Sequence, residues 1–157
     1  MLHCAARLRS RKYHLRDLLV SDLVYIALGL NIGDRAATLA RARTAIAAIK
    51  ETRIVAESAV EETAPLGPIP QDPYLNQMIA VETELAPRTL FTALQRIERA
   101  AGRIRSVRWG PRTLDLDIVM IDGKEFVDDV LTIPHPELGN RDFWQRELEE
   151  IRGVHHA

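Results

Sequence analysis

The sequence has 157 residues, of which 46% are hydrophobic, 27% charged and 5% aromatic, and its formal net charge is −1. This composition is typical of one globular domain that needs neither a disulfide nor a structural metal to hold its core. A single cysteine excludes an intramolecular disulfide, and no apolar stretch approaches the roughly 20 residues of a membrane-spanning helix. We therefore expect a soluble, cytoplasmic protein without a membrane segment.

Residues 1–22 differ in charge from the rest of the chain, with five basic and two acidic side chains and a local net charge of +3. They contain no continuous apolar segment, so a secretory signal is not expected. A disordered tail, an initiation codon assigned too early and an organelle transit peptide stay open as interpretations. We expect residues 1–22 to be a disordered basic extension, residues 23–152 to form the domain and residues 153–157 to form a tail.

The first half of the domain alternates strand and helix patterns. Residues 24–30 are an apolar run of strand formers, and residues 31–34 end it in a turn. Asp34 is placed to cap a helix in which Leu39, Ala42 and Ile46 recur at spacings of three and four. Residues 53–62 alternate as a half-buried strand does. Residues 63–73 hold half of the eight prolines, which predicts a stiff loop.

The second half repeats the pattern. Residues 74–85 favour a strand, Pro87 suits the first position of a helix, and Gly102 ends that helix. Residues 113–121 favour another strand, residues 122–123 a hairpin turn, residues 124–133 a further strand and residues 141–151 a last helix. This order predicts an α+β fold, a ferredoxin-like sandwich in which a mainly antiparallel sheet has helices packed on one face, with an extra C-terminal hairpin and helix.

Six arginines and one acid, Glu98, lie within residues 96–112. The planar guanidinium group matches the oxygens of a phosphate, so such a cluster indicates a polyphosphate or a nucleic acid as ligand. The arginines within residues 96–99 suit the solvent side of a helix. Arg103, Arg105 and Arg112 fall instead on a loop flanked by Gly102 and Gly110, and we interpret these three as ligand-binding.

The arginine-rich segment leads directly into Asp115 and Asp117. Residues two apart on a strand project to one face, so the two carboxylates stand side by side while Leu114, Leu116 and Ile118 point into the core. Adjacent carboxylates repel each other unless a cation lies between them. Magnesium takes one or two protein carboxylates together with substrate phosphates. The pattern therefore predicts Mg²⁺ bound between these aspartates and a nucleotide polyphosphate, on a scaffold that lacks P-loop and protein-kinase motifs.

Residues 108–118 (Arg-Trp-Gly-Pro-Arg-Thr-Leu-Asp-Leu-Asp-Ile) closely resemble the signature of the 6-hydroxymethyl-7,8-dihydropterin pyrophosphokinase family of folate biosynthesis. Further segments follow in family order, namely residues 25–34, 63–67, 74–76, 95–98, 131–136 and 140–143. The resemblance spans about residues 25–151. It implies a ferredoxin-like fold and a Mg²⁺-dependent enzyme that transfers pyrophosphate from ATP to the hydroxymethyl group of the pterin and releases AMP.

The resemblance also implies roles for individual residues. Asp115 and Asp117 would hold two Mg²⁺ ions and act in catalysis with Arg103 and Arg112. The residues implied for ATP are Gln95, Arg103, Trp109, Arg112, Ile118, Thr132 and His135. Those implied for the pterin are Thr63, Leu66, Tyr74, Asn76 and Phe143. Glu98 matches a family position without an assigned role. We expect a monomer with no nucleic-acid or membrane partner.

Alternatives stay open at this point. His135 between two prolines also suits an exposed turn, Trp109 and Phe143 suit a core, and Asn76 could cap a backbone group. Leu30 stands where the family usually has serine, Pro136 where some members have tyrosine, and residues 145–150 are more polar than the family's segment. An inactive relative that only binds nucleotide is one alternative. RNA binding is another, although residues 75–85 lack the aromatics that stack on bases.

Overall fold

The computed structural model describes residues 20–102 and 110–155. The expected extension up to residue 19, and with it Arg103, Arg105 and Trp109, lies outside these residues. The elements follow in the order β1 (Asp22–Leu30), α1 (Arg35–Ala47), β2 (Thr52–Glu57), β3 (Glu61–Thr63), β4 (Tyr74–Thr83), α2 (Pro87–Ala100), β5 (Asp115–Ile121), β6 (Phe126–Val127), β7 (Thr132–Ile133), a 3-10 turn (Leu138–Asn140) and α3 (Asp142–His155).

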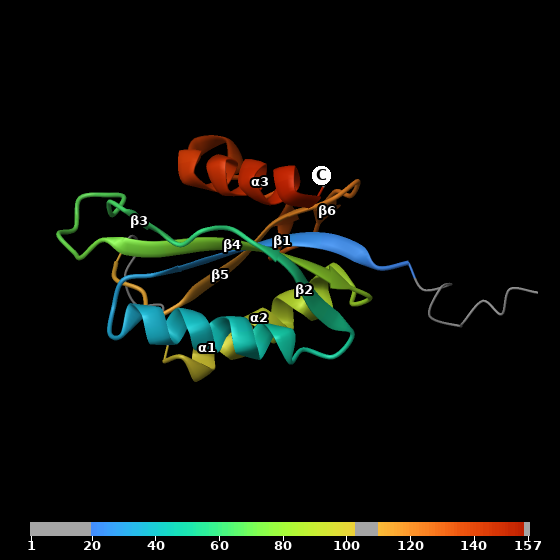
Figure 1. Cartoon of the computed structure of the whole chain (residues 1–157), viewed down its shortest axis with the longest axis horizontal. Coiled ribbons are helices and arrows are strands. Elements are labelled where there is room, and N and C mark those ends of the chain that lie inside the picture. The colour runs from blue at the N-terminus through green and yellow to red at the C-terminus, as the bar shows by residue number, and fades with distance from the viewer. Residues whose placement is uncertain (1–19, 103–109, 156–157) are drawn as a thin grey trace, which may run out of the picture.

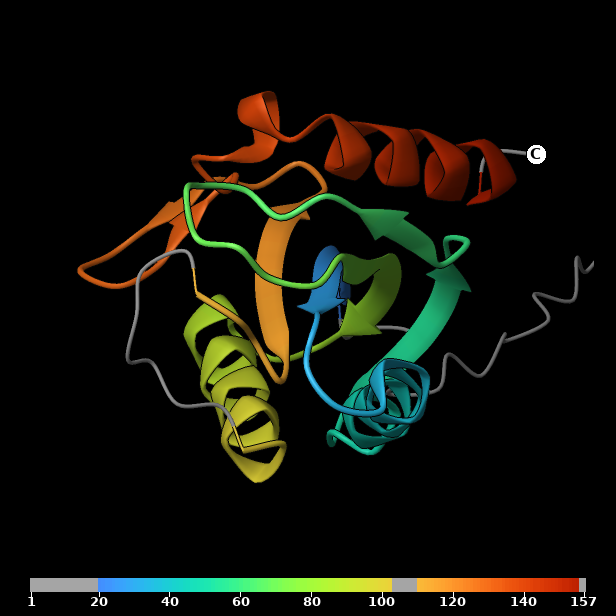
Figure 2. The ribbon, with the colours of Figure 1, turned by 90° about the vertical axis from the view of Figure 1, so that its left-hand side faces the viewer.

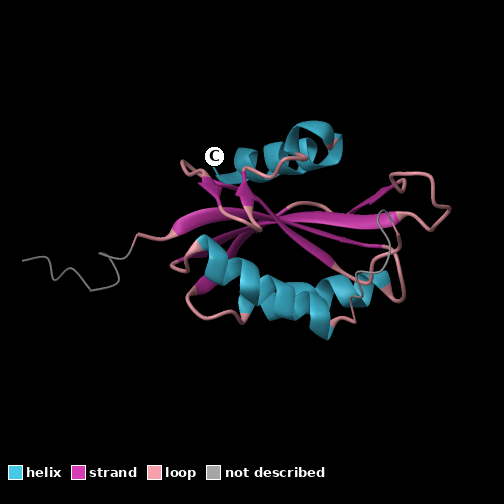
Figure 3. Ribbon diagram, turned by 180° about the vertical axis from the view of Figure 1, so that it is seen from behind, coloured by secondary structure: helices cyan, strands magenta, loops and turns pink. Residues whose placement is uncertain are grey.

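The main sheet is antiparallel and has the strand order β2-β4-β1-β5, with β3 also paired to β4. Helices α1 and α2 lie on one face of the sheet, and α3 covers the other face (Figures 1 and 3). The predicted α+β class and mainly antiparallel sheet are thus confirmed. None of the described helices is long and apolar enough to cross a membrane.

Each face of the sheet buries its own apolar cluster because side chains alternate along the strands. On β1, Val24, Ile26 and Leu28 pack toward α1 and α2. Tyr25 and Ala27 pack toward α3 on the opposite face. The sheet is therefore held between two layers of helix, and β1 is buried on both sides.

The helix boundaries follow the local signals in the sequence. Asp34 caps α1, since its side chain accepts a hydrogen bond from the amide of Ala37 at 3.1 Å. Pro87 is the first residue of α2. Gly102 follows the end of α2 with φ of +81°, a left-handed conformation that glycine adopts without strain. These predictions are confirmed.

Two predicted strands differ from the observed ones. The strand expected over residues 53–62 is divided, because Ser58 bonds to Met78 through both its amide and its hydroxyl group, each at 2.9 Å. The hydroxyl replaces a backbone carbonyl as the acceptor and interrupts the ladder between β2 and β3. After the turn at residues 122–123, the chain makes one bridge to β5, and β6 then pairs with β7 in a separate small sheet.

Candidate functional site

A pocket lies over the end of the sheet where β1, β4 and β5 run side by side, the end that faces the viewer in Figure 2. The strand register places Gly29 of β1 opposite Asn76 of β4 and Asp115 of β5. Two residues back on the same face, Ala27 stands opposite Asp117. A Cβ atom on Gly29 would lie 3.1 Å from Oδ1 of Asn76. The small residues of the central strand therefore leave space between the amide and the two carboxylates.

The walls of the pocket include the first turn of α3 and the loop after β3. Phe143 belongs to the first turn of α3 and contacts Trp144 edge-on, with ring centroids 6.2 Å apart. Leu66 belongs to the loop after β3 and is half exposed. The full lining is Ala27, Leu28, Gly29, Thr63, Ala64, Leu66, Tyr74, Asn76, Arg112, Asp115, Asp117, Arg141, Phe143 and Trp144. All five residues predicted to contact the pterin lie in this lining.

The two aspartates of β5 both face this pocket. Their neighbours Leu114, Leu116 and Ile118 are at most 3% exposed and pack in the core on the other face, as the alternation predicted. Among the described residues, no group of three or more His, Cys, Asp or Glu side chains could hold a metal ion. Two adjacent carboxylates that face an open pocket suit Mg²⁺, which takes its other oxygens from water and phosphates.

His135 lies beside Asp117, with 3.7 Å between Nε2 and Oδ1. Its Nδ1 accepts a hydrogen bond from the amide of Glu137 at 3.1 Å, so a neutral imidazole carries its proton on Nε2. Burial lowers the pKa of His135, and the positive charge of Arg141 lowers it further. The ring is neutral at pH 7 and directs an N–H group toward the acidic pair.

Asn76 and Tyr74 connect the pocket to the loops around it. The side-chain amide of Asn76 donates to the hydroxyl of Thr63, so its partner is a side chain and not the backbone group that the alternative interpretation suggested. The hydroxyl of Tyr74 lies 3.1 Å from the carbonyl oxygen of Gly110 and 3.3 Å from Oε1 of Gln71. Burial raises the pKa of Tyr74, which keeps this hydroxyl protonated.

Asn31 joins the two loops that border the site, a role that the sequence did not indicate. Its side chain is 4% exposed and donates to Oε1 of Gln71 at 2.9 Å and to the carbonyl of Asp72 at 2.8 Å. Its Oδ1 accepts the amide of Arg112 at 2.8 Å. One buried amide thus connects the proline-rich loop to the segment that carries Arg112.

The residues predicted to bind ATP, unlike those predicted to bind the pterin, do not all line the pocket. Arg112 lines the pocket. Gln95 on α2, Ile118 on β5, Thr132 on β7 and His135 after β7 do not line it. Helix α2 and strand β7, which carry Gln95 and Thr132, both contact β5. Ile118 is part of β5, and His135 lies beside Asp117. Ile118 is buried in the core and Thr132 is exposed.

Arg141 lines the pocket although no role was predicted for it. Its guanidinium carbon lies 4.3 Å from the centroid of the Trp144 ring. Within the described residues its buried Nε atom has no hydrogen-bond partner. The residue stands in a segment that the resemblance covered, residues 140–143, but that pattern assigned a role to Phe143 alone.

Comparison with known proteins gives a consistent result. The family model described as 7,8-dihydro-6-hydroxymethylpterin-pyrophosphokinase matches residues 25–153. The 2-amino-4-hydroxy-6-hydroxymethyldihydropteridine pyrophosphokinase of Methylorubrum extorquens is 43% identical over 127 residues, which are 81% of this chain and 80% of the relative. The enzyme of that name from Haemophilus influenzae is 44% identical over 127 residues, 81% of this chain and 79% of the relative. The Bacillus subtilis enzyme is 39% identical over 135 residues, 84% of this chain and 79% of the relative.

Proposed function

We propose a residue-level account of how this chain, which belongs to the 7,8-dihydro-6-hydroxymethylpterin-pyrophosphokinase family, performs the reaction of that family. The enzyme transfers the pyrophosphoryl group of ATP to hydroxymethyldihydropterin in folate biosynthesis. The hydroxyl oxygen of the pterin forms a bond to the β-phosphorus and gives up its proton to solvent. The bond from that phosphorus to the α-phosphate oxygen breaks, and AMP leaves with the electron pair of that bond. The row Asn76, Gly29 and Asp115 across three strands is the observation that carries the proposal.

The pterin would occupy the space above Gly29. A pterin is a flat heterocycle with an amide edge, so an aromatic ring and an asparagine side chain suit it. Phe143 supplies the ring, and Asn76 supplies the polar group at the edge of the same pocket. The Asn76 amide already donates to Thr63, which fixes the orientation of its side chain before the substrate binds. Leu66 and Tyr74 complete this half of the site.

The phosphates would lie on the β5 side of the pocket. Asp115 and Asp117 would hold Mg²⁺, which neutralises charge on the transferring group. Arg112 and Arg141 add two cations to the same lining, and guanidinium groups bind phosphate oxygens with two parallel hydrogen bonds. The neutral His135 carries its proton on Nε2, which lies 3.7 Å from Oδ1 of Asp117. We place the nucleotide beside β5 because Arg112 and the two aspartates line the pocket there and His135 lies beside Asp117.

Transfer of this kind needs little covalent chemistry from the protein. It needs the acceptor hydroxyl held in line with the phosphorus, and it needs water kept out of the site. The proline-rich loop that follows β3 borders the pocket through Ala64 and Leu66. Asn31 holds that loop to the Arg112 segment. We infer that this connection keeps the two substrates at a fixed relative position.

The test is the formation of AMP by the purified protein with Mg²⁺ and both substrates. Asp115→Asn and Asp117→Asn are each expected to abolish turnover while far-UV circular dichroism stays unchanged. Asp129→Asn is the matched control, since that side chain is 83% exposed on the loop before β7 and pairs only with Arg88 among the described residues. Wild-type turnover in both site variants would contradict the assignment of the aspartates.

Three finer points go beyond the family assignment. We propose two Mg²⁺ ions for each active site, which metal titration against a non-hydrolysable ATP analogue would count. We propose a monomer, which sedimentation would test. The cytoplasmic location expected from the sequence stays a prediction, which fractionation of cells would check.

A further inference from the structure

Glu98 is a buried acid to which the proposed reaction gives no role. Its side chain is 4% exposed and lies on the face of α2 that also buries Leu90 and Leu94. An ionised carboxylate is removed from water at a large cost unless hydrogen bonds or positive charge compensate it. The position of Glu98 therefore depends on particular partners.

One partner is the backbone of β5. Oε1 of Glu98 accepts a hydrogen bond from the amide of Leu116 at 2.9 Å, between residues 18 apart in the sequence. Leu116 stands between Asp115 and Asp117. The bond holds the peptide unit that links Asp115 to Leu116, and so fixes the backbone between the two carboxylates. Charge-assisted hydrogen bonds of this kind are stronger than bonds between neutral groups.

The bond matters because β5 is the edge strand of the main sheet. An edge strand has a strand partner on one side only, and its outer polar groups need other partners. Here the segment after β7 supplies one, since the amide of His135 donates to the carbonyl of Val119 at 2.8 Å. Glu98 supplies another at the end of β5 that carries the aspartates. The directions of Asp115 and Asp117 follow the backbone of this strand.

We propose that Glu98 is a positioning residue that holds Asp115 and Asp117 in the arrangement that binds a divalent cation together with the polyphosphate. This rests on the proposed function, because it takes the two aspartates as the metal ligands. Glu98 acts through the amide of Leu116 and does not itself touch the metal. Groups that support metal ligands in this way typically change metal affinity by about 10–100-fold when they are removed.

The experiment measures the binding of Mn²⁺ by electron paramagnetic resonance in the presence of a non-hydrolysable ATP analogue. Glu98→Leu removes the acceptor, whereas Glu98→Gln keeps a neutral one of the same shape. The dissociation constant of Mn²⁺ is expected to rise about tenfold or more in Glu98→Leu and by a smaller factor in Glu98→Gln. Exchange of the Leu116 amide hydrogen, followed by NMR without metal, is expected to become faster in both variants, and more so in Glu98→Leu than in Glu98→Gln.

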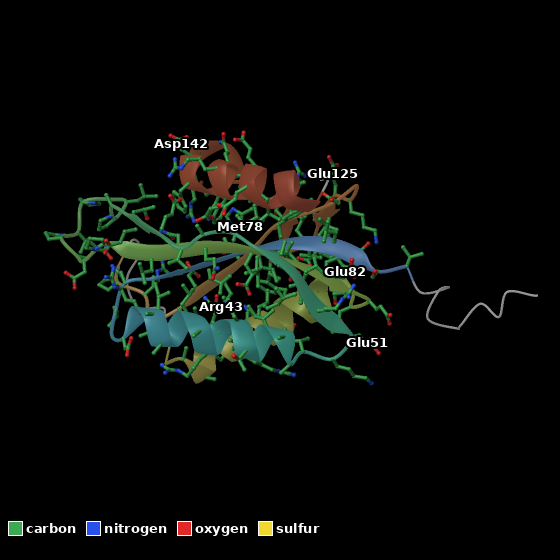
Figure 4. The ribbon with its side chains drawn as sticks, in the orientation of Figure 1. Arg43, Glu51, Met78, Glu82, Glu125 and Asp142 are labelled. Carbon is green, nitrogen blue, oxygen red and sulfur yellow. The ribbon has the colours of Figure 1, made fainter. Side chains whose placement is uncertain are left out.

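Glu82→Gln is the matched control. It removes a carboxylate that pairs with Arg53 at the end of β4 away from the pocket, where Figure 4 labels it. Both readouts should stay at their wild-type values in this variant. Because the probe is binding and amide exchange, a general loss of activity does not imitate the expected result.

Unchanged Mn²⁺ affinity in the Glu98 variants, with faster exchange at Leu116, would overturn the proposal, since the bond would then serve stability alone. If Glu98→Leu does not fold, Glu98→Gln decides by the same two readouts. Asp115→Asn is measured in the same series. If Asp115→Asn also binds Mn²⁺ with wild-type affinity, the metal site is wrongly assigned and both proposals are refuted. If Asp115→Asn loses affinity for Mn²⁺ but the Glu98 variants keep it, only the role of Glu98 is refuted.

Discussion

Glu147→Gln is expected to stabilise the protein at neutral and alkaline pH. Glu147 lies on the buried face of α3 with 3% of its surface exposed, and neither of its carboxylate oxygens has a hydrogen-bond partner among the described residues. Burial raises the pKa of Glu147 from 4.5 to about 8. The negative charge of Glu61 adds to this shift, and the positive charge of Arg146 opposes it. The folded protein therefore keeps a proton that the unfolded chain releases.

The sign of the effect follows from this difference in proton binding. Below pH 4.5 both states hold the proton, and the shift has no effect on the free energy of unfolding. As the pH rises from 4.5 to about 8, only the unfolded chain gives up the proton, and stability falls by about 1.4 kcal/mol per pH unit. The cost of Glu147 reaches about 3 kcal/mol at pH 7 and levels off near about 5 kcal/mol above pH 8.

Glutamine has the same shape as a protonated glutamate and does not ionise, so it removes this cost alone. The free energy of unfolding of the variant should exceed that of the wild type by less than about 1 kcal/mol at pH 5, about 3 at pH 7 and about 5 at pH 9. Urea denaturation at these pH values measures it. Glu149→Gln, on the exposed side of the same helix, should show no such trend. A difference between Glu147→Gln and the wild type that is constant from pH 5 to 9 would refute the reasoning.

Three further substitutions test the site. Gly29→Ala places a Cβ atom 3.1 Å from Oδ1 of Asn76. The KM for the pterin should rise about tenfold in the AMP assay, and an unchanged KM would contradict the position of the pterin. Asn31→Ala removes three hydrogen bonds that hold the loops. The free energy of unfolding should fall by about 2–3 kcal/mol in urea denaturation, because buried partners lose their bonds. A loss below about 0.5 kcal/mol would count against a connection between the two loops. Phe143→Ala should raise the KM for the pterin and leave that for ATP unchanged, and an equal rise in both would argue against stacking.

The helices were predictable because their signals are local. Asp34, Pro87 and Gly102 each fix a helix end through bonds or dihedral angles within a few residues. The interruption of the strand at Ser58 was not predictable in this way. It depends on two hydrogen bonds to Met78, which lies 20 residues further on and faces α3, and Figure 4 labels Met78 beneath that helix.

The same distinction applies to the site. The shared direction of Asp115 and Asp117 follows from strand alternation and was predicted from six consecutive residues. The roles of Gly29 and Glu98 follow from the register between strands and from the packing of α2 on β5, neither of which a local pattern contains. Gln95 and Thr132 lie on elements that contact β5 but are not among the residues that line the pocket, so their binding of ATP stays a prediction.

The polar character of residues 145–150, which departs from the family pattern, has a simple structural reason. In α3 the residues Trp144, Leu148 and Ile151 recur at spacings of three and four and are at most 6% exposed. The polar residues between them lie on the solvent side, except for Glu147. The departure therefore costs stability at one position and not along the whole helix. Trp144 of α3 both lines the pocket and packs against the sheet, whereas Glu147 does not line the pocket, so the charge at Glu147 can be removed without changing a residue of the lining.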